Sequence, residues 1–212
     1  MELGGVLEYA NGVLEQESKA REQGLKLSRE CIRFSANSIR AIHRGDRDQS
    51  IDLRRKAADS VSGAQTALAP YPRIYHAGFL QDAEKEYAEA AITFALIQGD
   101  PLPMSEDLGV DIAPYLNGLG EAAGEMRRHV LDLIRNNQLD RGEEILGIMD
   151  DIYFLLASVD YPSAMTGGLR RTNDMVRGVL ERTRGDLTTA IRRNSLERTI
   201  KNLEERLSSD DD

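Results

Sequence analysis

The chain has 212 residues and a formal net charge of -9, and its composition excludes several classes of protein. Aromatic residues make up 5% of the chain, 30% of the residues are charged and tryptophan is absent, which is typical of a helical protein rather than a sheet protein. No apolar run approaches the roughly 20 residues that span a bilayer, and the N-terminus lacks the pattern of a signal peptide, so we expect no membrane contact and a cytoplasmic location. The single cysteine, Cys31, excludes an internal disulfide and is expected in the core.

Glycines and prolines divide the chain into six to seven expected helices, and the six long ones lie at about residues 3–44, 50–68, 72–99, 111–136, 140–159 and 163–207. Gly45 is placed to cap the first helix, Pro72 to open the third, and the pair Gly167–Gly168 to kink the last. The chain has no internal repeat and no linker-like segment, so residues 1–212 are predicted to form one domain with a frayed tail at 208–212. Short connections pack successive helices antiparallel, so the predicted fold is an all-α, single-domain antiparallel bundle.

Charge is segregated along this chain. Residues 19–56 hold eleven lysines and arginines against five acids, a net charge of +6, whereas residues 81–111 hold eight acids against Lys85 alone, a net charge of -7. In the basic part, one stripe of arginines runs along the first helix, spaced four, seven and four residues apart: Arg29, Arg33, Arg40 and Arg44. A solvated face explains such a stripe as readily as a nucleic-acid contact does.

Two pairs of glutamates are spaced so that each pair shares one face of a helix. Glu86 and Glu89 are three residues apart at the edge of the uncharged run 90–98, and Glu121 and Glu125 are four residues apart. The preceding Glu84 and Lys85 fit a solvated face. Acids at these spacings are common on helix surfaces, so neither pair by itself indicates a site.

The surroundings of the second pair favour a site. Gly118, Gly120 and Gly124 each cost about 1 kcal/mol relative to alanine in a helix, and they make a surface that another backbone can approach closely. Two acidic pairs brought together there would repel each other unless a cation neutralised them. Carboxylate ligands without histidine or cysteine at ligand spacing favour Mg²⁺ or Mn²⁺, and phosphodiester hydrolysis is the chemistry that uses such a site.

Four segments in this order resemble the translin superfamily, and within it the translin-associated factor X branch in a compact, archaeal-type form. They are "LKLSRE" at 25–30, "IHR" at 42–44, "EYAEA" at 86–90 and "YLNGLGEAAGEMRR" at 115–128, and the likeness extends from about Lys19 to Arg193. The resemblance implies an all-α bundle that assembles into hollow octamers. Factor X subunits of the family cut single-stranded RNA with Mg²⁺ held by acidic residues, whereas translin subunits bind RNA without those acids.

Carried over to this chain, the resemblance implies that Glu86, Glu89, Glu121 and Glu125 are the metal ligands and the catalytic residues. Glu121 stands where the family has aspartate, so its carboxylate reaches about one methylene farther. The segment "YPRIYHAG" resembles the basic RNA-binding segment of the family and adds Arg73, Tyr75 and His76 to the four arginines as RNA-binding candidates.

The sequence therefore predicts a Mg²⁺-dependent endoribonuclease for single-stranded RNA that works as a homo-oligomer, an octamer by resemblance. Single-stranded DNA stays open as a second ligand. Two alternatives remain: a translin-type module that binds single-stranded nucleic acid without cutting it, and a helical scaffold that binds none. Clustered carboxylates favour the nuclease, and a dispersed arrangement favours the scaffold.

Overall fold

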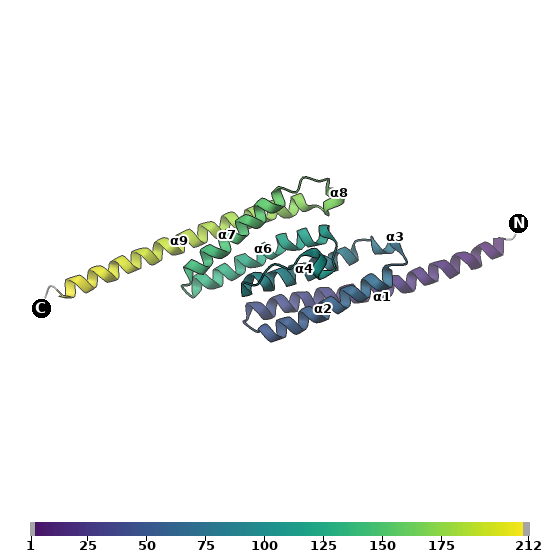
Figure 1. Ribbon diagram of the computed structural model, residues 1–212, viewed down its shortest axis with the longest axis horizontal. Helices are drawn as coiled ribbons and strands as arrows, with labels where there is room; N and C mark the ends of the chain where they lie inside the picture. Colours follow the sequence, from purple (N-terminus) through teal and green to yellow (C-terminus); the bar gives the residue numbers. More distant parts are fainter. Residues whose placement is uncertain (1–2, 210–212) are drawn as a thin grey trace. The chain divides into compact units, whose positions relative to one another are not determined.

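The computed structural model describes residues 3–209, which are helical throughout apart from their connections and contain no strand (Figure 1). Its six long helices are α1 (Leu3–His43), α2 (Arg47–Leu68), α4 (Phe79–Gln98), α6 (Ile112–Arg135), α7 (Leu139–Ala157) and α9 (Leu169–Ser209). Three four-residue helices, α3 (Pro72–Tyr75), α5 (Ser105–Leu108) and α8 (Ser163–Thr166), lie in the connections. The predicted all-α bundle is confirmed. Within residues 3–209, no helix is long and apolar enough to cross a membrane.

The chain divides into two compact units, and α6 runs from one into the other. The first unit comprises Met1–Ala122 with Tyr161–Leu169, and the second comprises Ala123–Asp160 with Arg170–Asp212. The single domain expected over residues 1–212 stays a prediction.

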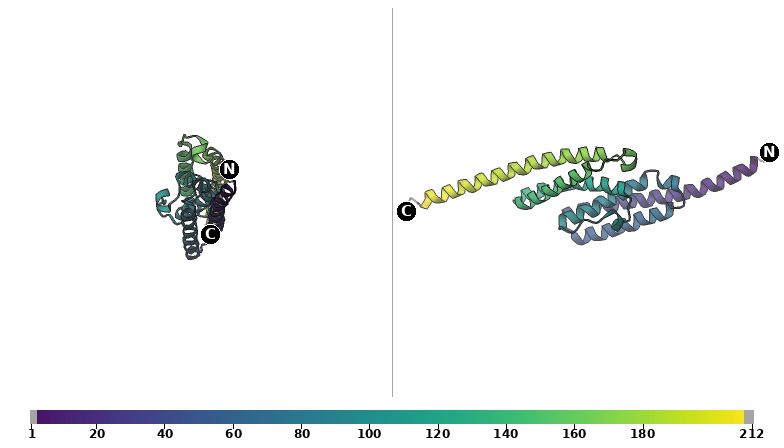
Figure 2. Two further views of the ribbon diagram at one scale, coloured as in Figure 1. Left: turned by 90° about the vertical axis from the view of Figure 1, so that its right-hand side faces the viewer. Right: turned by 45° about the horizontal axis from the view of Figure 1, so that its top comes forward.

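Helices α1, α2 and α4 pack side by side in the first unit (Figures 1 and 2). Gly45, with φ 79°, makes the turn between α1 and α2, and the Asp46 side chain caps α2 by accepting a hydrogen bond from the backbone N–H of Gln49 at 3.2 Å. Cys31 is fully buried in the core that these helices share, as predicted. Its pKa is raised to about 12 because burial removes water from the thiolate.

Glycines break two of the helices that the sequence predicts as continuous. Residues 72–99 form α3 and α4 rather than one helix, because Gly78 adopts φ 100° at the start of α4. The Gln81 side chain holds this break by accepting from the backbone N–H of Gly78 and donating to the carbonyl of Tyr75. At the other end, positive φ angles at the pair Gly167–Gly168 separate α8 from α9, which is a break rather than a kink.

The second unit is built from α7, α9 and the C-terminal part of α6. Val130, Ile145, Met149 and Leu187 are almost completely buried in it. Of the tail predicted to fray, residues 208 and 209 belong to α9, and residues 210–212 lie outside the described part of the chain.

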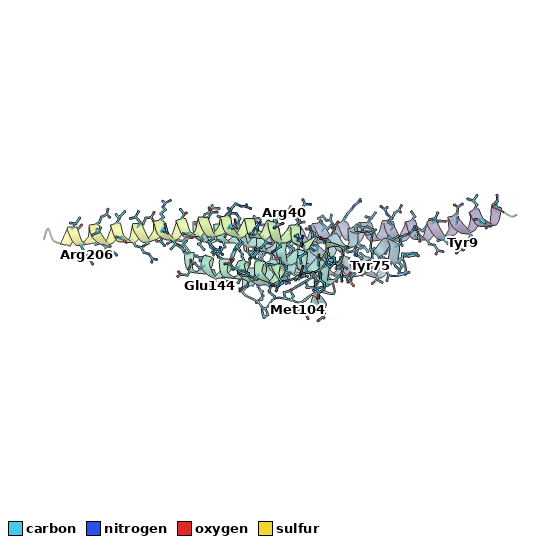
Figure 3. The ribbon with its side chains drawn as sticks, turned by 90° about the horizontal axis from the view of Figure 1, so that it is seen from above. Tyr9, Arg40, Tyr75, Met104, Glu144 and Arg206 are labelled. Atoms are coloured by element: carbon cyan, nitrogen blue, oxygen red, sulfur yellow. The ribbon has the colours of Figure 1, made fainter. Side chains whose placement is uncertain are left out.

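Both long terminal helices continue past the residues that pack. No residue of 3–23 is buried, and we call this part of α1 the N-terminal arm; Tyr9 lies on it, 76% exposed (Figure 3). The last part of α9, residues 195–208, is exposed throughout and is the C-terminal arm. Its large apolar side chains repeat at intervals of four, three and four residues: Leu196, Ile200, Leu203 and Leu207.

Candidate metal centre

Three of the four predicted ligands come together in the first unit. One carboxylate oxygen from each of Glu86, Glu89 and Glu121 lies within 4.8 Å of the other two, and we call these residues the glutamate cluster. Glu86 and Glu89 stand one turn apart on α4, and Glu121 reaches them from α6. Glu89 is 8% exposed, whereas the other two are half-buried. The cluster offers oxygen donors alone, which are the ligands that Mg²⁺ and Mn²⁺ prefer.

The close packing of α6 on α4 brings these carboxylates together. A Cβ added to Gly118 would lie 2.7 Å from the carbonyl oxygen of Lys85 and 3.0 Å from the backbone nitrogen of Glu89. Only glycine permits the backbones to meet at this distance, because any side chain would overlap the carbonyl. The predicted role of the glycines thus holds for Gly118, whereas a Cβ on Gly124 would meet nothing within 4 Å.

Lys85 supplies a positive charge to the glutamate cluster. Its ammonium lies 2.7 Å from Oε1 of Glu121, to which it donates a hydrogen bond, and 3.5 Å from Oε1 of Glu86. Burial by itself would lower the pKa of Lys85, but Glu121 and Glu86 hold it above its ordinary value. Burial raises the pKa of Glu86, and Glu121 raises it further, while Lys85 acts in the opposite direction. The expectation of a solvated Lys85 was therefore wrong.

Glu125 lies one turn after Glu121 on α6 and belongs to the second unit. It is half-buried. Its assignment as the fourth ligand stays a prediction.

Glu84 is fully buried, although the sequence placed it on a solvated face. Its Oε1 accepts a hydrogen bond of 2.7 Å from Nε2 of Gln65, which also donates to the carbonyl of Gly109 at 2.8 Å. Burial raises the pKa of this carboxyl, while its hydrogen bond with Gln65 acts in the opposite direction. Glu84 thus joins α4 to α2 and, through Gln65, to the loop before α6.

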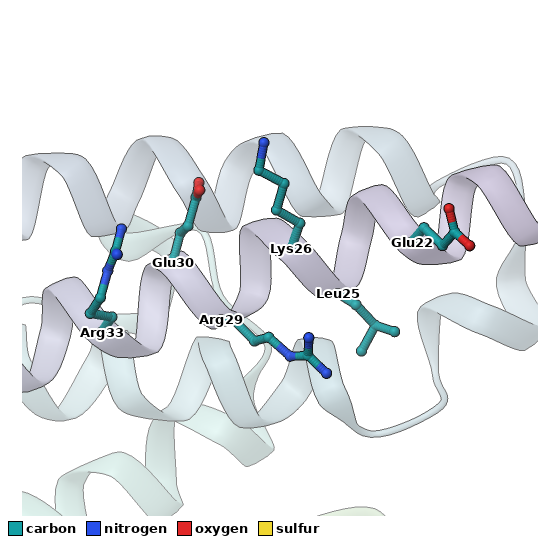
Figure 4. Close-up of a pocket in the computed structure, with 6 residues that line it drawn as sticks. All are labelled: Glu22, Leu25, Lys26, Arg29, Glu30 and Arg33. Carbon is teal, nitrogen blue, oxygen red and sulfur yellow. The ribbon is translucent and has the colours of Figure 1, made fainter.

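The predicted arginine stripe lies in the first unit, with all four side chains exposed on α1 or just after it. Figure 4 shows a surface pocket at its N-terminal end, where Arg33, Glu30 and Lys26 point to one side of α1 and Arg29 to the other. The guanidinium of Arg33 also lies 5.0 Å from the ring centre of the adjacent Phe34. The RNA-binding role of the stripe stays a prediction.

The second group of RNA-binding candidates lies at α3. Arg73 is exposed and makes an ion pair with Glu17. The rings of Tyr75 and His76 contact each other edge to face, with their centres 4.9 Å apart. Tyr75 is half-buried and His76 exposed, so His76 presents the more accessible ring for stacking on a base.

Sequence reasoning missed the contact of two basic residues, Arg47 and Arg54, with the ring of Phe94. It counted both in the net charge of residues 19–56 and grouped Arg54 with Arg55 and Lys56 as a second basic cluster, without predicting what these side chains contact. It also missed the burial of Glu84, although the spacing of apolar residues could have predicted it. Glu84 follows Leu80 by four residues and precedes Tyr87 by three, which puts Glu84 on the packed face of α4.

The chain matches no family model but resembles one curated protein and several solved structures. An uncharacterized protein of Methanocaldococcus jannaschii is 32% identical over 206 residues, which cover 96% of this chain and 91% of that protein. The crystal structure of AfC3PO gives a TM-score of 0.80 at 33% identity, covering 87% of this chain and 96% of AfC3PO. The complex of AfC3PO with duplex RNA gives 0.80 at 34% identity, covering 87% and 95%. Apo-NeC3PO gives 0.73 at 20% identity, covering 89% and 96%, and shares the fold.

Proposed function

We propose a function from the premise that this chain belongs to the translin superfamily, as do AfC3PO and NeC3PO. The chain is a Mg²⁺-dependent endoribonuclease that hydrolyses phosphodiester bonds of single-stranded RNA. The observation that carries this proposal is the glutamate cluster, with three carboxylates within 4.8 Å of one another. AfC3PO has been solved with duplex RNA, which supports RNA as the ligand class. Single-stranded DNA is the second ligand to test.

Glu86, Glu89 and Glu121 would hold the divalent ion, with Mn²⁺ as a substitute for Mg²⁺, and Glu125 is the proposed fourth ligand. When bound, such an ion stabilises charge on the phosphoryl group and activates water for attack. Lys85 would compete with the ion for Glu121, because its ammonium donates a hydrogen bond to Oε1. Glu89 is the most buried of the three, at 8% exposure.

Cleavage of a labelled single-stranded RNA tests the proposal, with Mg²⁺ or with EDTA. Glu89→Gln keeps the size of the side chain but removes its charge, so we expect cleavage to be lost while the far-UV circular dichroism is unchanged. Glu106→Gln is the matched control, because Glu106 is exposed on α5 and the net charge changes equally. Cleavage that persists in EDTA or in Glu89→Gln contradicts the metal nuclease.

One observation favours the second candidate, a translin-type module that binds single-stranded nucleic acid without cutting it. Lys85 already neutralises part of the glutamate cluster, and in this second candidate the acids serve only to form that structural ion pair. Lys85→Met separates the two candidates. For a metal centre, the variant binds Mn²⁺ more tightly than wild type, because the competing ammonium is gone. For a structural ion pair, it loses stability without gaining affinity for Mn²⁺.

We further propose that the protein works as a homo-oligomer, with eight copies by family resemblance. The two arms support this, because their apolar side chains are exposed in the single chain and a second copy would cover them. Light scattering coupled to gel filtration measures the number of copies. The cytoplasmic location stays a prediction.

A further inference from the structure

Four arginines near the turn between α1 and α2 form no ion pair with a carboxylate in the described part of the chain. Two are on the last turns of α1 or just after it and two are on α2, and we call them the arginine patch: Arg40, Arg44, Arg47 and Arg54. Within residues 3–209, no carboxylate lies within ion-pair distance of these guanidinium groups. The neighbouring Arg55 and Lys56 differ, because both are paired with Asp52.

Neutral amide groups orient three members of the patch. The hydrogen bonds join Arg40 to Asn37 at 2.8 Å, Arg44 to Gln49 at 3.0 Å and Arg47 to Gln98 at 3.0 Å. An amide oxygen fixes the direction of a guanidinium but leaves its full charge, and each bond uses one of the five N–H donors. The three arginine side chains are therefore held in place, and each keeps its full charge and further N–H donors for a ligand.

Arg54 is fixed in another way. Its guanidinium carbon lies 3.9 Å from the ring centre of Phe94, at cation–π distance, and that of Arg47 lies 5.8 Å from the same centre. Its Nε is buried and has no hydrogen-bond partner among residues 3–209. Burial lowers the pKa of Arg54, as does the charge of Arg47, while Asp100 and Tyr87 act in the opposite direction. The guanidinium groups of Arg47 and Arg54 thus lie close together over the Phe94 ring, and an anion is favoured beside them.

We propose that the arginine patch binds consecutive phosphates of the RNA backbone, an inference that rests on the proposed RNA binding. Arg47 and Arg54 thereby join Arg40 and Arg44 as contact residues. Guanidinium groups bind phosphate oxygens through paired hydrogen bonds, and such contacts fix the position of a strand without reading its sequence. The patch therefore contributes affinity that falls with salt and is independent of base sequence.

Fluorescence anisotropy of a labelled single-stranded RNA, titrated with the full-length protein in EDTA at several salt concentrations, tests this. Three variants each lower the net charge by one. Arg47→Gln removes a member of the patch, Gln98→Glu places a carboxylate on Arg47, and Arg55→Gln removes an arginine that Asp52 already neutralises. We expect the first two to lose about fivefold in affinity at 0.1 M salt and to lower the salt slope by about 0.7, the value for one phosphate on a single strand. Arg55→Gln should match wild type.

Other results overturn the inference. If Arg47→Gln, Gln98→Glu and Arg55→Gln all bind like wild type, the patch does not contact phosphate, while the proposed function stands. If all three weaken binding equally, net charge alone acts and the patch has no special role. If wild type binds no RNA, the inference falls together with the proposed function.

Discussion

Gly118→Ala is the change whose outcome the packing of α6 on α4 determines most directly. The new Cβ would lie 2.7 Å from the carbonyl oxygen of Lys85, a fixed backbone atom, so the two helices must move apart by several tenths of an ångström. Overpacking of this kind costs about 1–3 kcal/mol, whereas replacing a helical glycine by alanine gains about 1 kcal/mol. We therefore expect a net loss of about 0–2 kcal/mol in the free energy of unfolding.

Gly124→Ala is the matched control on the same helix, because a Cβ there meets nothing within 4 Å. It should gain up to about 1 kcal/mol, so the two variants should differ by about 1–3 kcal/mol in urea unfolding. Moving the helices apart also carries Glu121 away from Glu89, so Gly118→Ala should bind Mn²⁺ more weakly in a calorimetric titration. A Gly118→Ala protein as stable as Gly124→Ala would refute the close approach and its role in assembling the site.

Three further outcomes follow from other contacts. Gln65→Ala should lower the free energy of unfolding, measured in urea, by about 1–3 kcal/mol, because it removes the hydrogen bond from Gln65 to the buried Glu84 carboxyl. Thr66→Ala, at an exposed neighbouring position, is the control, and equal stabilities of the two variants would contradict a stabilising Gln65–Glu84 hydrogen bond. The Cys31 thiol, fully buried and with its pKa raised to about 12, should react with a thiol reagent only in the unfolded protein, and rapid reaction of the native protein would show that Cys31 is accessible. Leu203→Glu should reduce the mass measured by light scattering, and an unchanged mass would show that the C-terminal arm makes no contact between copies.

The sequence was enough to predict the helices and most of their ends, because glycine and proline act locally. It predicted the turn at Gly45 and the buried Cys31. Spacing and resemblance predicted four clustered glutamates, of which Glu86, Glu89 and Glu121 come together and Glu125 stays a prediction. The break at Gly78 escaped it because a single glycine within a helical pattern is compatible with a continuous helix.

Partners of charged side chains could not be predicted. Lys85 follows Glu84 directly in the sequence. The side chain of Glu84 is nevertheless buried among α2, α4 and a loop, whereas the ammonium of Lys85 meets the carboxylates of Glu86 and Glu121. Adjacent helical residues point about 100° apart, so a pair of charges in the sequence says little about which of them meets an opposite charge. The same holds for Arg47, whose amide partner lies 51 residues away.

The ion pairs of Lys85 also bear on whether folding depends on metal binding, as it does in many metal proteins. Where nothing but the ion neutralises its ligands, the metal-free chain unfolds, and a chelator acts as a denaturant. Here the ammonium of Lys85 meets two of the three carboxylates without any ion, so α4 and α6 stay packed whether or not the proposed ion is bound. On the proposed function, chelation of the ion would therefore leave the chain folded, and an ion could bind again without a new round of folding.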